Sequence, residues 1–278
     1  MKGRVLIIAG SDSGGGAGIQ ADIKTVTALG AYAATAITAL TAQNTLGVQG
    51  ILPVPPAFVK QQIDSVLADL GADCIKTGML LDHGVIEAAA DAIEKGAPGV
   101  PLVVDPVMIA STGARLLDPR AFDALLQRFI ARAALVTPNA PEAEALTGVK
   151  IANIDDMRRA ADALLKTGAA AVMVKGGHVP PNEKDGEMVR DLVVTPAESF
   201  ILAAPRIDTR HTHGTGCTLA SAIAAGLAQG MLLKAAIERA HAFVAAAIRT
   251  APGFGHGHGP LNHAHQLPRA PIGPADVN

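Results

Sequence analysis

The stretch RVLIIAGSDSGGGAGIQAD, residues 4–22, joins an apolar run to a glycine-rich turn and to the start of a helix. A short run of Val, Leu and Ile without polar interruption is typical of a strand buried on both faces, as in a parallel sheet. The glycines that follow allow the backbone to turn sharply and to approach a ligand closely. This order of strand, loop and helix predicts an α/β fold with a ligand site beside residues 10–22.

The glycine-rich loop matches neither of two common phosphate-binding motifs. No Lys-Ser or Lys-Thr pair follows its glycines, and Ile19 occupies the third glycine position of the dinucleotide fingerprint. A flexible loop without a ligand is one interpretation, but so many glycines cost backbone entropy, which favours close contact with a small substrate. Asp22, expected in the first turn of the next helix, contacts that substrate or favours the helix dipole.

The pattern of a buried strand followed by a helix repeats along the chain. Further strands are predicted at 73–79, 100–106, 133–139 and 170–177, and helices at 18–30, 55–70, 83–95, 119–131, 141–147, 155–167, 215–230 and 233–249. The segment 190–209 predicts an antiparallel hairpin at a sheet edge. We expect one domain over residues 1–267, with a mostly parallel sheet and helices on both faces, and a disordered tail at 268–278.

The composition of the chain argues against nucleic acid and membranes as partners. The 278 residues are 49% apolar and 17% charged, and the formal net charge of −2 gives no electrostatic reason to expect nucleic acid or an anionic membrane surface. No segment approaches the roughly 20 apolar residues of a membrane helix, and the first apolar run is too short for a signal peptide. Cys74 and Cys217 cannot form a disulfide framework. We therefore expect a cytoplasmic protein.

The segment THGTGCT, residues 212–218, opens a predicted helix. Its two glycines let the backbone turn tightly, so successive N–H groups converge at a helix N-terminus and suit the charge of a transferred phosphoryl group. Cys217 lies where the helix dipole is expected to lower the pKa of a thiol; a small, inert core cysteine is the alternative. The predicted anion site consists of Gly214, Thr215, Gly216 and Cys217.

Polar residues also follow the other predicted strands, and ligands of open parallel sheets bind beyond the carboxyl ends of the strands. Asp105 and Glu142 are candidates for holding Mg²⁺, mostly through water, although each could instead cap a loop or a helix. Lys175 is a candidate phosphate contact, or a charge in solvent. Together on one edge of a sheet, these residues favour phosphoryl transfer.

Four histidines near the C-terminus are spaced closely enough to suggest a metal site. No cysteine accompanies them, and the segment lacks a firm helix that would fix their geometry. The favoured interpretation is a solvated loop that covers the site. These histidines are His256, His258, His263 and His265.

Seven motifs, taken in order, resemble the hydroxymethylpyrimidine/phosphomethylpyrimidine kinases of thiamine biosynthesis, a family of the ribokinase-like superfamily. They are AGSDSGGGAGIQADIKT, TALTAQNT, IKTGML, DPVMIASTGARLL, TPNAPEAEALTG, VKGGH and THGTGCTLASAIA, and the resemblance extends from Arg4 to about His265. It implies a ribokinase-like three-layer sandwich. It also implies that ATP phosphorylates 4-amino-5-hydroxymethyl-2-methylpyrimidine, and then the monophosphate, with Mg²⁺.

The resemblance leaves some points open. A pyridoxal or pyridoxine kinase of the cysteine-bearing subgroup is the alternative activity, and a non-catalytic pyrimidine sensor is a third class. Dependence on a monovalent cation is undecided. We expect a homodimer that binds a small pyrimidine and neither nucleic acid nor membranes.

Individual roles follow from the resemblance. Gln43 is expected to bind the aminopyrimidine, since one carboxamide offers both a donor and an acceptor. Cys217 stands where most of the superfamily has an aspartate base, and is expected to take the hydroxymethyl proton in the first step. Gly10, Asp22, Met79 and Val107 would complete the pyrimidine pocket, Asp105 and Glu142 would organise Mg²⁺, and Asn139 and Lys175 would bind phosphates.

Overall fold

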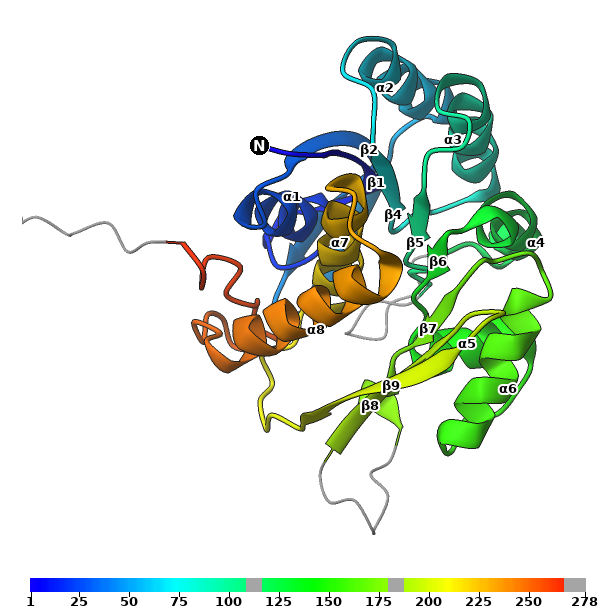
Figure 1. Ribbon diagram of the computed structural model, residues 1–278. Coiled ribbons are helices and arrows are strands. Elements are labelled where there is room, and N and C mark those ends of the chain that lie inside the picture. Colours follow the sequence, from blue (N-terminus) through cyan, green and yellow to red (C-terminus); the bar gives the residue numbers. More distant parts are fainter. Residues whose placement is uncertain (109–116, 180–187, 268–278) are drawn as a thin grey trace, which may run out of the picture.

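The computed structural model describes residues 1–108, 117–179 and 188–267. Within these ranges one sheet has the strand order β3-β2-β1-β4-β5-β6-β7-β8-β9 (Figure 1). The strands are β1 (Arg4–Asp12), β2 (Tyr32–Asn44), β3 (Gly47–Pro53), β4 (Cys74–Thr77), β5 (Leu102–Val104), β6 (Leu135–Val136), β7 (Val172–Val174), β8 (Met188–Val194) and β9 (Ser199–Pro205). The tail expected at 268–278 lies outside the described residues.

Neighbouring strands from β2 to β7 pair in parallel, which confirms the mostly parallel sheet. Antiparallel strands complete both edges: β3 pairs with β2, and the hairpin of β8 and β9 pairs with β7. The hairpin confirms the prediction for residues 190–209. All carboxyl ends of the parallel strands therefore meet along one edge of the sheet.

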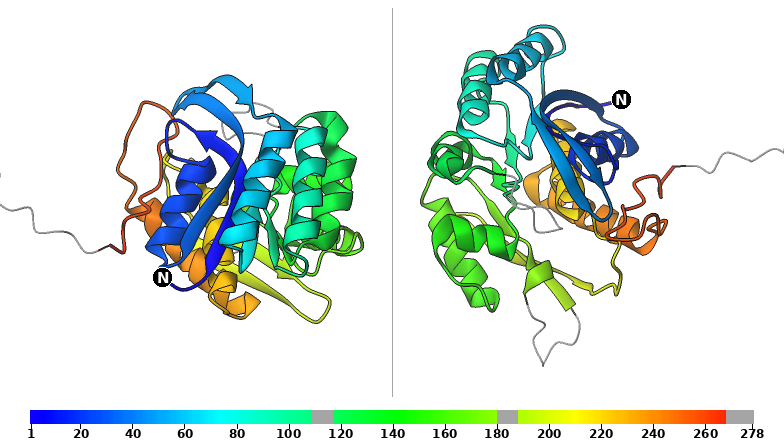
Figure 2. Two further views of the ribbon diagram at one scale, coloured as in Figure 1. Left: turned by 90° about the horizontal axis from the view of Figure 1, so that it is seen from above. Right: turned by 180° about the vertical axis from the view of Figure 1, so that it is seen from behind.

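Helices cover both faces of the sheet (Figures 1 and 2). Leu6 and Ile8 of β1 pack toward α2, α3 and α6, whereas Val5 and Ile7 pack toward α1, α7 and α8. Successive side chains of a strand point to opposite faces, so residues 5–9 of β1, which are covered on both faces, are all apolar. The predicted three-layer sandwich is thus confirmed. The helices are α1 (Gly18–Ala28), α2 (Pro56–Asp69), α3 (His83–Gly96), α4 (Phe122–Ala124), α5 (Ala140–Thr147), α6 (Ile154–Leu165), α7 (Thr215–Ala228) and α8 (Leu233–Arg249).

Two parts of the fold differ from the sequence prediction. Strands β2 and β3 are not predicted, because the sequence of β2, YAATAITALTAQN, is rich in Ala and Thr and lacks an apolar run. Its strand conformation is stabilised by parallel pairing with β1. The segment predicted to be helical at 119–131 is helical but irregular. A 3₁₀ turn, Pro119–Ala121, is followed by the single turn of α4, by a π-helical turn, Leu125–Phe129, and by a second 3₁₀ turn, Ile130–Arg132.

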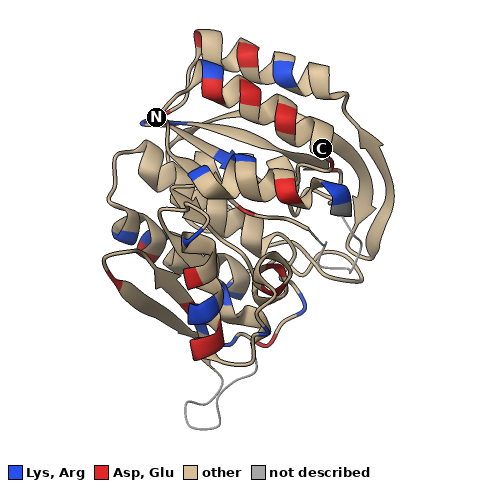
Figure 3. Cartoon of the chain, turned by 90° about the vertical axis from the view of Figure 1, so that its right-hand side faces the viewer, with Lys and Arg blue, Asp and Glu red and all other residues tan. Residues whose placement is uncertain are grey.

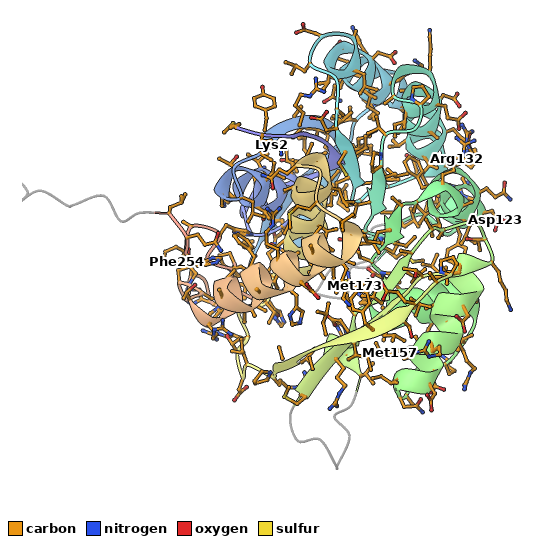
Figure 4. The ribbon with its side chains drawn as sticks, viewed as in Figure 1. Lys2, Asp123, Arg132, Met157, Met173 and Phe254 are labelled. Atoms are coloured by element: carbon orange, nitrogen blue, oxygen red, sulfur yellow. The ribbon has the colours of Figure 1, made fainter. Side chains whose placement is uncertain are left out.

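Charged residues of both signs are interspersed on the outer helices (Figure 3). The side chains of Met157 and Met173 lie in the two cores, one on each side of the sheet, whereas Asp123 and Arg132 point outward (Figure 4). In the part of the chain that the structure describes, no helix is long and apolar enough to cross a membrane.

Candidate active site

A cavity of about 1010 Å³ runs along the carboxyl edge of the sheet. It extends from β1 and β2 at one end, past the segments that follow β5, β6 and β7, to β8, β9 and α8 at the other. All but one of the residues proposed from the sequence line it. These are Gly10, Gln43, Met79, Asp105, Val107, Asn139, Glu142, Lys175, Gly214, Thr215, Gly216 and Cys217; Asp22 is the exception.

The middle of the cavity holds a compact cluster of charged side chains. Lys175 Nζ lies 3.0 Å from Asp105 Oδ1 and 3.9 Å from Glu142 Oε2. Burial alone would lower the pKa of Lys175, but the two carboxylates raise it, so its ammonium is charged. The side chain therefore offers a fixed positive charge to an anionic ligand.

Glu142 and Asn139 also form the N-terminal cap of α5. Asn139 Oδ1 accepts a hydrogen bond from Glu142 N–H, and Glu142 Oε2 accepts one from Asn139 N–H, each at 2.8 Å. The capping role considered for Glu142 is therefore present together with its place in the charged cluster. Burial raises the pKa of Glu142 to about 7, and Asp105 adds to this effect while Lys175 opposes it.

These carboxylates suit a hard cation such as Mg²⁺, which prefers oxygen ligands and keeps much of its water. Asp105 and Glu142 are both buried and share a single ammonium, that of Lys175. Among the described residues, no group of three or more acidic, His or Cys side chains is arranged to hold a metal ion. A cation here would depend on water and phosphate oxygens for its remaining ligands.

The N-terminus of α7 has the tight geometry expected for an anion site. Gly214 has φ +84°, and a Cβ atom there would lie 1.9 Å from Gly16 O, so only glycine fits. Gly216 brings the backbone against Lys175, whose Nζ would lie 3.1 Å from an added Cβ. Thr215 N–H donates to Thr212 O, while in the described part of the chain no acceptor engages the N–H of Gly216 or Cys217. Those two groups remain available to a ligand.

Cys217 lies in the first turn of α7, as predicted, but the pKa of its thiol is raised and not lowered. Burial raises the pKa of Cys217 to about 12; Lys76 and the Gly18 N–H oppose this rise, and the carboxylates of Asp22 and Asp105 add to it. The expected lowering of the pKa by the helix dipole is therefore wrong. Loss of hydration and nearby negative charge exceed the effect of the dipole. The resting side chain is a thiol.

Asp22 belongs to a buried ion pair and not to the cavity wall. Its two carboxylate oxygens each lie 2.9 Å from Lys76 Nζ, and Ser221 Oγ donates to Oδ1 at 2.7 Å. Asp22 and Lys76 are both 0% exposed. Asp22 is the fifth residue of α1, so the predicted position in its first turn is also wrong. Lys76 is not among the predicted site residues, although a lysine inside a buried strand indicates a buried partner.

This ion pair lies directly beneath Cys217. Ser221 is one helical turn after Cys217 on α7, and residues four apart share a face of a helix. Burial alone would lower the pKa of Lys76, but the carboxylate of Asp22 raises it, so a full positive charge stands behind the thiol. The pair joins β4 to α1, and Ser221 connects it to α7.

The β1–β2 end of the cavity is organised by Asp12, which the sequence analysis did not assign. Its carboxylate accepts hydrogen bonds from the N–H groups of Gly14, Gly16 and Ala17 at 2.8 to 3.1 Å, and so shapes the glycine-rich loop. An acidic residue before a glycine run is the signal that could have found it. Met79 packs over Gly10, where an added Cβ would lie 2.7 Å from its Cε. A side chain at Gly10 would displace Met79 from this wall.

The C-terminal histidines do not form a metal site in the described part of the chain. The buried His263 lies 2.9 Å from Thr218 Oγ1, and the ring of His265 packs against Phe243 at 4.6 Å. His258 N–H donates to Thr45 O, so this segment covers the loop after β2.

Comparison with known proteins places the chain. The family model described as phosphomethylpyrimidine kinase matches residues 12–262. The chain belongs to this kinase family. It is 47% identical to the hydroxymethylpyrimidine/phosphomethylpyrimidine kinase of Bacillus subtilis, over 94% of both chains. It is 52% identical to the thiamine biosynthesis bifunctional protein of Geobacter sulfurreducens, over 94% of this chain but only 52% of that protein.

A solved structure shares the architecture closely. The structure of Bacillus subtilis pyridoxal kinase in an ADP complex superposes with a TM-score of 0.85 at 34% identity, over 95% of this chain and 98% of that one. A phosphomethylpyrimidine kinase family member and a pyridoxal kinase thus share one fold, so the fold alone does not decide the substrate.

The buried ion pair generates a stability prediction. Asp22→Asn leaves the ammonium of Lys76 buried without its counter-charge, which is expected to cost about 3–5 kcal/mol in the free energy of unfolding. The matched control is Asp73→Asn, because Asp73 pairs with Arg4 at the surface. This variant is expected to lose about 1 kcal/mol or less in the free energy of unfolding. Urea denaturation at neutral pH measures both. An Asp22 variant of unchanged stability that loses only pyrimidine affinity would restore the substrate-contact interpretation.

Proposed function

We propose that the chain is a cytoplasmic ATP-dependent kinase that phosphorylates 4-amino-5-hydroxymethyl-2-methylpyrimidine and then its monophosphate. The observation that carries the proposal is the continuity of one cavity from the Gln43 end to the Lys175 cluster and α8. A volume of about 1010 Å³ accommodates a small heterocycle and a nucleotide end to end. Membership of the phosphomethylpyrimidine kinase family supports the choice of heterocycle.

The pyrimidine would occupy the end of the cavity at β1 and β2. Gln43 provides the carboxamide that pairs with a ring nitrogen and its adjacent amine. Gly10, Met79 and Val107 provide the apolar walls. This placement directs the hydroxymethyl group of the substrate toward the N-terminus of α7.

The nucleotide would occupy the other end. Its base would lie among Pro205, Val244 and Ile248, which give this end an apolar lining between β9 and α8. Its phosphates would then reach Lys175 and the free N–H groups of α7. The carboxylates of Asp105 and Glu142 would hold Mg²⁺, which neutralises phosphate charge when it is bound.

Cys217 would accept the proton of the alcohol late in the phosphoryl transfer. With a thiol pKa of about 12, only about one molecule in 10⁵ carries a thiolate at pH 7, so a preformed thiolate is not the reacting species. Phosphoryl transfer places little charge on the attacking oxygen until late in the reaction, and positioning dominates the catalysis. Cys217 would orient the alcohol and take its proton as the bond to phosphorus forms, while Lys76 stabilises the developing thiolate.

A kinase assay with product masses tests the proposed function. The purified chain, ATP and Mg²⁺ are combined with the aminopyrimidine alcohol, with its monophosphate, or with pyridoxal, in Na⁺ and in K⁺ buffers. We expect mono- and diphosphate products from the pyrimidines and a higher rate than on pyridoxal. Faster turnover of pyridoxal would favour the second candidate, a pyridoxal kinase, which the likeness to the Bacillus subtilis enzyme supports. Binding of the pyrimidine without ATP turnover would indicate a sensor.

The two phosphorylations should differ in their need for Cys217. Cys217→Ala is expected to slow phosphorylation of the alcohol by about 10²- to 10⁴-fold, because a neutral hydroxyl must lose a proton as it attacks. The monophosphate already carries negative charge, so its phosphorylation should slow much less. Single-turnover kinetics with each acceptor at saturating ATP measures the two effects.

The second cysteine provides the control. Cys74 is fully buried in β4 and outside the cavity, so Cys74→Ala should leave the ratio of the two rates unchanged. Equal losses for both acceptors in Cys217→Ala would mean that this residue shapes the anion site and accepts no proton.

We also propose that the protein is a homodimer formed through β2, β3 and α2. Large apolar side chains are exposed along this edge: Leu40, Leu46, Ile51, Leu52 and Phe58. An exposed apolar edge strand favours association with another surface, and a second copy would cover it.

Leu52→Glu should shift the protein toward the monomer in sedimentation velocity experiments, because it places a charge in the proposed interface, where Leu52 is 64% exposed in the free chain. The matched control is Leu232→Glu, at an 82% exposed site between α7 and α8, which should leave the sedimentation coefficient unchanged. A wild-type protein that sediments as a monomer would exclude this interface.

A further inference from the structure

A chain of polar contacts connects Gln43 to two residues that have no assigned role, Asp12 and His213. Nε2 of His213 lies 2.8 Å from Asp12 Oδ2 and 3.3 Å from Gln43 Nε2. Gln43 Oε1 lies 3.1 Å from Thr41 Oγ1, which is itself 3.0 Å from Ser11 O. The backbone of Gln43 is held as well, because its N–H and C=O both bond to Ser13 Oγ.

One ring nitrogen cannot serve both of its neighbours in this arrangement. A hydrogen bond to a carboxylate requires that Nε2 of His213 carries a proton, whereas a bond from the amide of Gln43 requires a lone pair there. The charge of Asp12 determines whether Nε2 of His213 carries the proton. Burial alone would raise the pKa of Asp12, but the bonds from His213 and from Ala17 N–H lower it, so the carboxylate is ionised. The proton therefore belongs on Nε2.

The hydroxyl of Thr41 presents the same conflict. Its single proton can go to Gln43 Oε1 or to Ser11 O, but not to both. Both conflicts disappear when the carboxamide of Gln43 is turned by 180°. His213 Nε2–H is then shared between Asp12 and Gln43 Oε1, Gln43 Nε2 donates to Thr41 Oγ1, and Thr41 donates to Ser11 O. Each donor has an acceptor.

We propose that His213, held by Asp12, is a positioning residue that fixes the orientation of the Gln43 carboxamide and thereby selects an aminopyrimidine. One lone pair of Oε1 and one N–H of Nε2 remain for the ligand, in a fixed order. They pair with an exocyclic amine that donates and an adjacent ring nitrogen that accepts. A pyrimidine with an exocyclic oxygen and a ring N–H shows the reversed pattern, and a locked carboxamide rejects it. This inference rests on the proposed function.

The test compares the aminopyrimidine alcohol with its 4-oxo analogue, 5-hydroxymethyl-2-methylpyrimidin-4-one. For the wild-type protein we expect kcat/KM to favour the amine by about 100-fold or more, since the analogue leaves two buried polar groups mismatched. In His213→Phe the carboxamide can turn, so this ratio should fall at least about tenfold, mainly through KM, with KM for ATP unchanged. His213→Gln can still donate to Asp12 and should keep more of the preference.

A matched control lies two residues away. His211 is outside the cavity, so His211→Gln should leave the ratio at the wild-type value. Equal losses on both substrates in the His213 variants, with an unchanged ratio, would overturn the proposal and leave His213 a structural residue. A wild-type protein that phosphorylates neither pyrimidine would instead refute the proposed function.

The protonation of His213 is also tested without any variant or any turnover. In ¹⁵N NMR spectra of the wild-type protein, Nε2 of His213 should have the chemical shift of a protonated ring nitrogen. The shift of an unprotonated nitrogen would show that His213 accepts from Gln43, and would overturn the proposal independently of the substrate.

Discussion

The site depends on the ion pair between Lys76 and Asp22, neither of which is exposed to solvent. Removing two charges from water costs several kcal/mol for each ion, and only close geometry with further hydrogen bonds offsets that cost. Here both oxygens of Asp22 contact Nζ, and Ser221 satisfies a further lone pair. Because these residues come from β4, α1 and α7, the pair fixes the two helices against the sheet. Cys217 and the glycine-rich loop are therefore held on a rigid support.

Several carboxylates serve structure and chemistry at once. Glu142 caps α5 and also faces Lys175, while Asp12 holds the glycine-rich loop and also contacts His213. The capping interpretation of Glu142 is therefore confirmed, while its role in holding Mg²⁺ stays a prediction. A side chain locked by a cap has little freedom to move, and this rigidity preorganises it for a ligand.

The environment of Cys217 shows how tertiary structure overrides a local rule. A helix N-terminus lowers the pKa of a thiol because its N–H groups carry partial positive charge. Burial and two carboxylates act in the opposite direction and prevail, so the pKa rises to about 12. Of these two carboxylates, only that of Asp105 lines the cavity, because Asp22 is paired with Lys76.

The sequence alone determined the alternation of strands and helices and the antiparallel hairpin. It also indicated Asp105, Glu142 and Lys175 as cavity residues, because strand ends of a parallel sheet converge on one edge. It did not determine β2, since alanine and threonine show no clear period until β1 lies beside them. Nor did it determine the partners of Lys76 and His213, which lie 54 and 201 residues away in the chain, at Asp22 and Asp12. Hydrogen bonds between such distant residues depend on the packing of whole elements. Only tertiary structure decides which buried charge finds a partner and which remains for the substrate.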